Sequence, residues 1–158
     1  MKITSTAFQN GTLIPTKYAH HGVAGGNNIS LPFSWSDVPS ETKSFALSIV
    51  DPHPVANNWV HWFVINIPAG ANSISEGASK KSMPLGCKEL FNTYGTPGYG
   101  GPEPPKGSGS HPYVVTIYAL SVETLDLSEK SSLLEFNAAM KGKVILTAKT
   151  TGYFEQKS

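Results

Sequence analysis

Three side chains that can donate, accept or transfer a proton lie within or beside apolar segments of this sequence. Asp51 ends one segment, His61 lies inside the next, and His111 precedes a third. If the first two segments are neighbouring strands, their short connecting loop brings Asp51 and His61 together. Imidazoles can donate hydrogen bonds to an anion, a carboxylate can fix their tautomer, and nearby glycines let backbone N–H groups approach. We therefore expect a small-anion pocket around these residues.

Each of these residues also has an ordinary structural explanation, which the sequence leaves open. A lone histidine in an apolar strand is more often a hydrogen-bonded core residue than a ligand contact. An aspartate before a proline, as in Asp51-Pro52, commonly begins a turn. His111 can be a plain loop residue, and the glycine- and proline-rich segment before it can be an ordinary surface loop.

Sharper catalytic or metal-binding signatures are missing from the sequence. Gly107-Ser108-Gly109 lacks the spacing of the Gly-x-Ser-x-Gly nucleophile elbow. The glycines at 98, 100 and 101 match neither a P-loop nor a Rossmann fingerprint. The histidines are not spaced like zinc ligands, and Cys87 is more simply a small apolar side chain than a nucleophile. We therefore predict no bound metal and no cofactor.

Side-chain periodicity predicts the elements that position these residues. Alternation with a period of two predicts strands over 44–51, 59–67, 113–120 and 144–154. In the second strand, His61, Phe63 and Ile67 are expected to share one face, and both faces are mostly apolar, as in a central strand. Residues 34–36 are expected to lead into a turn, and 69–111 to form one long irregular segment, which in a compact domain is usually functional.

One helix is predicted over 132–140. Ser132 and Glu135 form a capping-box pattern at its start, and Leu133, Phe136 and Met140 recur at helical spacing. Gly142 is a plausible stop.

The composition fits one mainly β domain over 1–158. The 12 Lys and Arg residues barely exceed the 11 Asp and Glu residues, so no basic surplus exists for nucleic acid. No apolar run approaches the ~20 residues of a membrane helix. A single cysteine and the lack of an apolar leader lead us to expect a cytoplasmic protein without membrane insertion. The 15 Gly and 12 Pro residues divide the chain into short runs, as in β-sandwiches.

Two long motifs resemble the signatures of the phosphatidylethanolamine-binding protein family. Asp51-Pro-His-Pro-Val-Ala-Asn-Asn-Trp-Val-His61-Trp62 is similar to the first, Asp-Pro-Asp-Ala-Pro followed by a His-Trp pair. Gly98-Tyr-Gly-Gly-Pro-Glu-Pro-Pro-Lys-Gly-Ser-Gly-Ser-His111-Pro-Tyr113 is similar to the second. The length resembles the bacterial and archaeal Raf-kinase-inhibitor-like branch of that family.

The resemblance implies an antiparallel β-sandwich with one or two short helices and a pocket for phosphate or a similar anion at one end. The pocket positions, carried over by motif, are Asp51, His53, His61, Gly100, Pro102, His111 and Tyr113. His53 stands where the family has a second aspartate, so a potential donor replaces an acceptor and the rim becomes less negative.

The motifs and the resemblance favour a protein that binds phosphate or a phospho-head-group and regulates or inhibits a partner enzyme, a kinase or a serine protease. A hydrolase whose His–Asp pair activates water on an ester or phosphoester, and a lipid or small-molecule carrier, stay open as alternatives. The motifs place no nucleophile, which favours a non-enzymatic role. Tyr94 and Tyr99 can line a homodimer interface or simply pack the loop.

Overall fold

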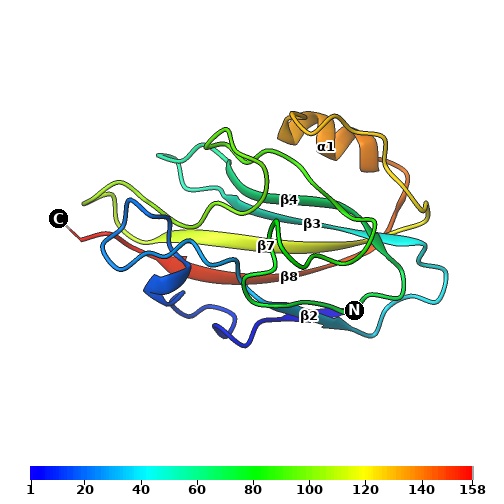
Figure 1. The fold of residues 1–158 in the computed structure, drawn as a ribbon, viewed down its shortest axis with the longest axis horizontal. Helices are drawn as coiled ribbons and strands as arrows, with labels where there is room; N and C mark the ends of the chain where they lie inside the picture. The colour runs from blue at the N-terminus through cyan, green and yellow to red at the C-terminus, as the bar shows by residue number, and fades with distance from the viewer. Residues whose placement is uncertain (158) are drawn as a thin grey trace.

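The computed structural model describes residues 1–157 and shows a mainly β chain with one α-helix (Figure 1). The elements in chain order are β1 (Lys2–Thr4), the 3₁₀ helix η1 (Thr16–Tyr18), β2 (Phe33–Ser36), β3 (Ser44–Asp51), β4 (Trp59–Pro68), β5 (Ser73–Ile74), β6 (Lys88–Glu89), β7 (His111–Leu120), α1 (Leu133–Met140) and β8 (Val144–Phe154). The predicted fold class is confirmed, because all strand pairs in the sheets are antiparallel and helices are few.

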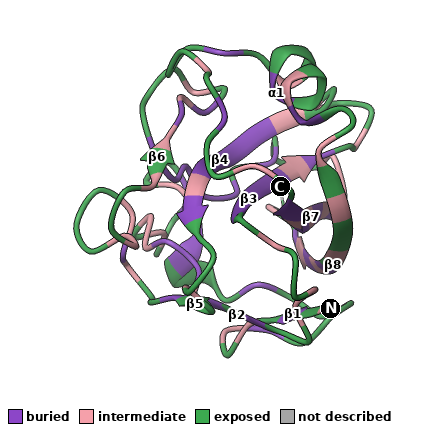
Figure 2. Ribbon diagram, turned by 90° about the vertical axis from the view of Figure 1, so that its right-hand side faces the viewer, coloured by how far each residue is buried: buried purple, intermediate pink, exposed green. Residues whose placement is uncertain are grey.

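The strands form two sheets, and the larger one is covered on both faces. β1, β2 and β5 form a three-stranded sheet, and the larger sheet has the order β6-β4-β3-β7-β8. One apolar core lies between the sheets and a second lies between the larger sheet and α1. In Figure 1, β2 and α1 lie on opposite sides of the long strands. This double cover explains why β3 and β4 are almost wholly buried (Figure 2).

Two irregular positions in β4 break the predicted alternation of its side chains. The β3–β4 ladder skips His61, because the β4 residues on either side of it pair with consecutive residues of β3. A second irregularity lies beside Asn66, whose φ is +58°. Each inserted residue reverses the alternation, so Trp62 and Ile67 pack between the sheets while Phe63 packs toward α1. The prediction that His61, Phe63 and Ile67 share one face is therefore wrong.

The long elements match the sequence better than the short ones. The predicted bounds of β3 and β8 are confirmed, β4 runs one residue further, and β7 begins two residues earlier. Segment 69–111 is not wholly irregular, since it contains the two-residue strands β5 and β6. Residues 34–36 belong to β2, and the turn begins at Asp37, whose φ is +55°. Strands this short show no periodic pattern, so pairing with distant segments defines them.

Helix α1 attaches to the larger sheet mainly through Phe136, whose ring contacts Phe63 of β4 and Tyr118 of β7. Its capping box is formed as predicted, since the Ser132 hydroxyl accepts a bond from the Glu135 N–H and the Glu135 carboxylate accepts one from the Ser132 N–H. Phe136 is fully buried, and its ring stacks on that of Phe63 with centroids 4.3 Å apart. Leu134, on the outer side of the helix, is exposed.

We predict that Phe136→Ala lowers the free energy of unfolding by about 3–5 kcal/mol, because it leaves a cavity between α1 and the sheet. Leu134→Ala, in the same helix but exposed, is the matched control and changes stability by less than about 0.5 kcal/mol. Urea unfolding followed by circular dichroism measures both. Equal losses in the two variants would show that Phe136 does not anchor the helix.

Candidate functional site

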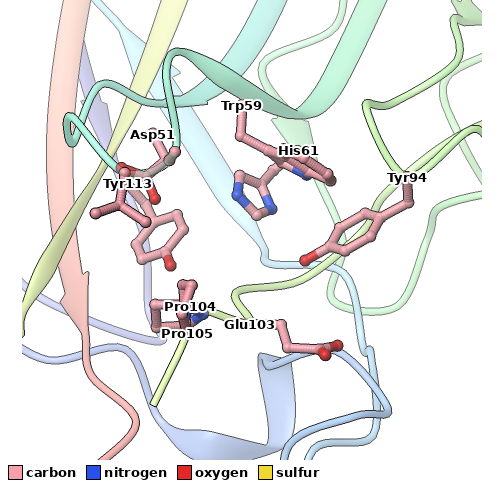
Figure 3. A pocket seen from close by; sticks show the side chains of 10 residues that line it. Asp51, Trp59, His61, Tyr94, Glu103, Pro104, Pro105 and Tyr113 are labelled. Carbon is pink, nitrogen blue, oxygen red and sulfur yellow. The ribbon is translucent and has the colours of Figure 1, made fainter. Parts of the chain in front are cut away.

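A cavity of about 280 Å³ lies at the end of the larger sheet, where β3 ends and β4 and β7 begin (Figure 3). Its walls come from these strand ends and from the loops 52–58 and 90–110. The lining residues are Asp51, Val55, Ala56, Trp59, His61, Tyr94, Glu103, Pro104, Pro105 and Tyr113. The side chains are mostly aromatic or aliphatic, and the lining includes two carboxylates but no lysine or arginine.

His61 faces this cavity as a neutral imidazole. The bulge in β4 places its ring between Trp59 and Tyr113, as Figure 3 shows. Its Nδ1 donates a hydrogen bond of 2.7 Å to the carbonyl oxygen of Gly100. Burial lowers the pKa of His61 to about 4, although the Gly100 carbonyl and the Asp51 charge favour the protonated form. Near neutral pH the Nε2 of His61 is therefore a hydrogen-bond acceptor.

The buried Asp51 carboxylate is bonded through both of its oxygens. Oδ1 accepts the backbone N–H of His53 at 2.9 Å, and Oδ2 accepts the Nδ1–H of His111 at 2.6 Å. His111 is fully buried and does not line the cavity; its Nε2 lies 2.9 Å from the hydroxyl of Ser108. The structure thus places His111 behind Asp51, as its partner.

His53 lies outside the cavity lining, stacked on the ring of His111 with centroids 3.8 Å apart and planes at 7°. Its Nδ1 accepts the backbone N–H of Val55 at 3.1 Å, which puts the ring proton of the neutral form on Nε2. His53 therefore supports His111 and the loop after β3, and its side chain does not replace a carboxylate inside the cavity.

Two hydrogen-bond donors in the cavity wall have no partner. Within residues 1–157, three buried side-chain polar atoms make no hydrogen bond, and two of them, the Tyr113 hydroxyl and the Trp59 Nε1, belong to cavity-lining residues. Burying an unpaired donor costs about 1–3 kcal/mol. Each unpaired buried group calls for an explanation, and ordered water or a ligand carrying hydrogen-bond acceptors would satisfy these two.

Gly100 and Gly101 of the second motif contribute close packing and a carbonyl group. The Gly100 N–H already donates to the His61 carbonyl, and the Gly101 N–H donates to Asn28 Oδ1. A Cβ on Gly100 would lie 2.5 Å from the Tyr94 ring. The expectation that these N–H groups bind the anion is therefore wrong. Pro102, also predicted for the pocket, lies outside the lining, and its carbonyl accepts the backbone N–H of His20.

The wall opposite β3 and β4 comes from residues that the sequence analysis did not assign to the pocket. The Tyr94 ring lies beside the rings of Trp59 and His61, and its hydroxyl donates to the Gly101 carbonyl at 2.6 Å. Glu103 binds His20 at 2.8 Å. Glu103 lies between Pro102 and Pro104 in the second motif, and nothing in that motif marked it as a pocket residue.

Tyr99 does not lie where the dimer alternative needs it. It is buried in the core between the sheets, and its hydroxyl donates to the Tyr18 carbonyl at 2.8 Å. That part of the dimer prediction is wrong, and Tyr94 forms part of the cavity wall.

Within residues 1–157, no helix has the length and apolar character needed to cross a membrane.

The chain matches the family model described as "Phosphatidylethanolamine-binding protein" over residues 4–155. A UPF0098 protein of Aquifex aeolicus is 36% identical over 156 residues, covering 99% of this chain and 89% of that protein. YbhB of Escherichia coli is 36% identical, covering 84% of this chain and 85% of that protein. The crystal structure of E. coli YbcL, described as a member of the mammalian PEBP family, superposes with a TM-score of 0.92 at 33% identity, covering 99% and 98% of the two chains.

The fold and the sequence therefore show that the chain belongs to the phosphatidylethanolamine-binding protein family. Within that family, the chain belongs to the bacterial and archaeal branch of UPF0098 proteins that includes YbhB and YbcL.

We predict that acid weakens the fold through His61. In the unfolded chain an imidazole binds a proton near pH 6.5, whereas the buried His61 does so only near pH 4. Between these values the unfolded state holds more protons, so the free energy of unfolding falls as pH falls, by up to about 3 kcal/mol from this group. His61→Gln flattens this part of the profile.

Urea unfolding in half-unit pH steps measures this effect, with the exposed His21→Gln as control. If the free energy of unfolding of His61→Gln fell with pH as steeply as that of the wild type between about pH 6.5 and pH 4, His61 would not be the group responsible.

We also predict opposite outcomes for two buried tyrosines. Tyr113→Phe removes an unpaired hydroxyl and leaves the free energy of unfolding unchanged or raises it. Tyr99→Phe removes a made hydrogen bond and leaves the Tyr18 carbonyl without that donor, at a cost of about 1 kcal/mol. Thermal or urea unfolding distinguishes them; a clear loss in Tyr113→Phe would mean that its hydroxyl has a partner in the free protein.

Proposed function

We propose that this protein binds a small oxyanion, phosphate or a phospho-head-group, in the cavity beside Asp51, and that the occupied site regulates a partner enzyme, a kinase or a serine protease. The observation that carries the proposal is that two residues lining one cavity each hold an unpaired donor, the Tyr113 hydroxyl and the Trp59 Nε1–H. Phosphate oxygens are strong acceptors and would satisfy both.

The charges of the site favour a ligand that keeps one proton. Asp51 and Glu103 are acidic, no lysine or arginine lines the cavity, and His61 is neutral near pH 7. A dianion would therefore meet no compensating charge in the lining. A monoanion carries a P–O–H group that can donate to the free Nε2 of His61, while its other oxygens accept from Tyr113 and Trp59. Neutral His61 is thus matched to a protonated oxyanion.

The size of the cavity favours a head group over a whole lipid. About 280 Å³ lies just below the range for small-molecule sites, roughly 300–1,000 Å³. A carrier needs an apolar tunnel for acyl chains, and this cavity ends at the polar groups of Asp51 and His61. The carrier alternative is therefore less well supported than head-group binding.

We predict that titration calorimetry with inorganic phosphate and with phosphoethanolamine detects binding that strengthens from pH 7.5 to pH 5.5. A phosphate monoester has its second pKa near 6, so its monoanion dominates at the lower pH. Tyr113→Phe and Trp59→Phe each weaken binding by about tenfold, the equivalent of one hydrogen bond of ~1.4 kcal/mol. Tyr99→Phe, which changes a tyrosine outside the cavity, binds as the wild type does.

Undiminished binding in both Tyr113→Phe and Trp59→Phe would refute this site. Inhibition assays with a panel of kinases and serine proteases, with phosphate present or absent, then test the regulatory part. Inhibition that is the same with and without phosphate would show that the surface that binds the partner enzyme acts independently of the cavity.

A further inference from the structure

We propose that Ser108, His111 and Asp51 form a second site, a nucleophilic triad able to cleave small activated esters. The Ser108 Oγ lies 2.9 Å from His111 Nε2, and His111 Nδ1 lies 2.6 Å from Asp51 Oδ2. A hydroxyl within reach of an imidazole that a carboxylate orients is the geometry by which serine nucleophiles are recognised on unrelated folds.

The proposed nucleophile is accessible to solvent, whereas its base and the orienting carboxylate are buried, as such a site requires. Asp51 and His111 have side chains that are 3% and 0% exposed, so the base and its orienting carboxylate are shielded from water. Ser108 is partly exposed and lies outside the cavity lining. The triad and the cavity therefore share only Asp51.

The loop presents Ser108 between two glycines in left-handed conformations. Gly107 has a φ of +80° and Gly109 a φ of +89°, values that other residues adopt only with strain. A Cβ built on Gly109 would meet no atom within 4 Å, so the space beside the nucleophile is open. The N–H groups of Gly109 and Ser110 make no hydrogen bond among residues 1–157. The first belongs to the residue after the nucleophile, a common source of an oxyanion-hole donor.

The proton positions define the active form. The carboxylate of Asp51 accepts a hydrogen bond from the Nδ1–H of His111. In this tautomer of the neutral ring, Nε2 carries no proton and is a hydrogen-bond acceptor. The Ser108 hydroxyl has one proton and two neighbours, the Pro105 carbonyl at 2.6 Å and His111 Nε2 at 2.9 Å. Rotation about the Cβ–Oγ bond moves this proton from the carbonyl to Nε2, and the second arrangement activates the hydroxyl.

The reaction follows from these positions. Ser108 Oγ forms a bond to the acyl carbon of an ester while its proton passes to His111 Nε2, and the carbonyl electron pair moves onto its oxygen near the Gly109 N–H. As the tetrahedral intermediate collapses, the bond to the alcohol oxygen breaks and the alcohol leaves with the proton from Nε2. Water then attacks the acyl-serine in the same way and releases the acid and the free hydroxyl.

A phosphonofluoridate probe tests the triad directly, because the Ser108 oxygen displaces fluoride and keeps a stable phosphonyl group. We expect the wild-type protein at pH 8 to gain one adduct, located on Ser108 by peptide mass spectrometry. Ser108→Ala abolishes the adduct. Ser110→Ala, which removes the exposed serine two residues further on, is the matched control and labels at the wild-type rate. His111→Gln, with its fold checked by circular dichroism, lowers the labelling rate of Ser108 by about 100-fold.

The proposal is overturned if the wild type gains no adduct on Ser108, or if Ser108 labels equally fast in a folded His111→Gln protein. Tyr113→Phe separates this site from the anion cavity, since it weakens phosphate binding and leaves labelling of Ser108 unchanged. p-Nitrophenyl acetate provides the second readout. We expect a burst of one nitrophenol per chain that Ser108→Ala removes and Ser110→Ala keeps.

Discussion

The buried carboxylate of Asp51 is the constraint on which this end of the molecule depends. A charge taken out of water is tolerated only when it is paired and hydrogen-bonded. Here the backbone N–H of His53 and the ring of His111 occupy its two oxygens. Those bonds tie the end of β3 to the loop that follows it and to the first residue of β7. The cavity keeps its shape because the end of β3 and the start of β7, 60 residues apart in the sequence, must meet at this one carboxylate.

The second constraint is the extra residue in β4. In a regular strand His61 would point into one of the two apolar cores, where an imidazole has few partners. The bulge instead places it against the Gly100 carbonyl, which fixes its proton on Nδ1 and leaves Nε2 toward the cavity. Burial then keeps the ring uncharged at neutral pH. The same residue therefore contributes to the site an acceptor of defined direction and not a positive charge.

The sequence predicted what depends on long periodic segments and on local chemistry. β3, β8 and the capping box of α1 are of this kind, and so is the placement of Asp51 and His61 at one cavity. Tyr113 was assigned to the pocket only by the resemblance of the second motif. The face of His61 was not predictable, because alternation assumes a regular ladder and a bulge is a property of two paired strands.

Tyr94 and Glu103 reach the cavity from a segment whose course is set by contacts with distant residues, such as the bond between Gly101 and Asn28. Ser108 was set aside because its flanking glycines do not match a known elbow. Ser108 precedes His111 by only three positions in the sequence, and this short separation was a usable signal that the two side chains can meet.

Asp51 links the two sites, and the link limits how they can be exchanged in evolution. Toward the cavity it is part of the wall, and under the proposed function its negative charge would favour a protonated oxyanion. The same carboxylate accepts the hydrogen bond from His111 Nδ1, and His111 Nε2 lies 2.9 Å from Ser108 Oγ. Losing the carboxylate would remove both functions at once, whereas the outer groups are independent. Tyr113 and Trp59 can change without disturbing the triad, and Ser108 can change without disturbing the cavity. If both proposals hold, the buried pair of Asp51 and His111 would allow binding and nucleophilic chemistry to diverge separately.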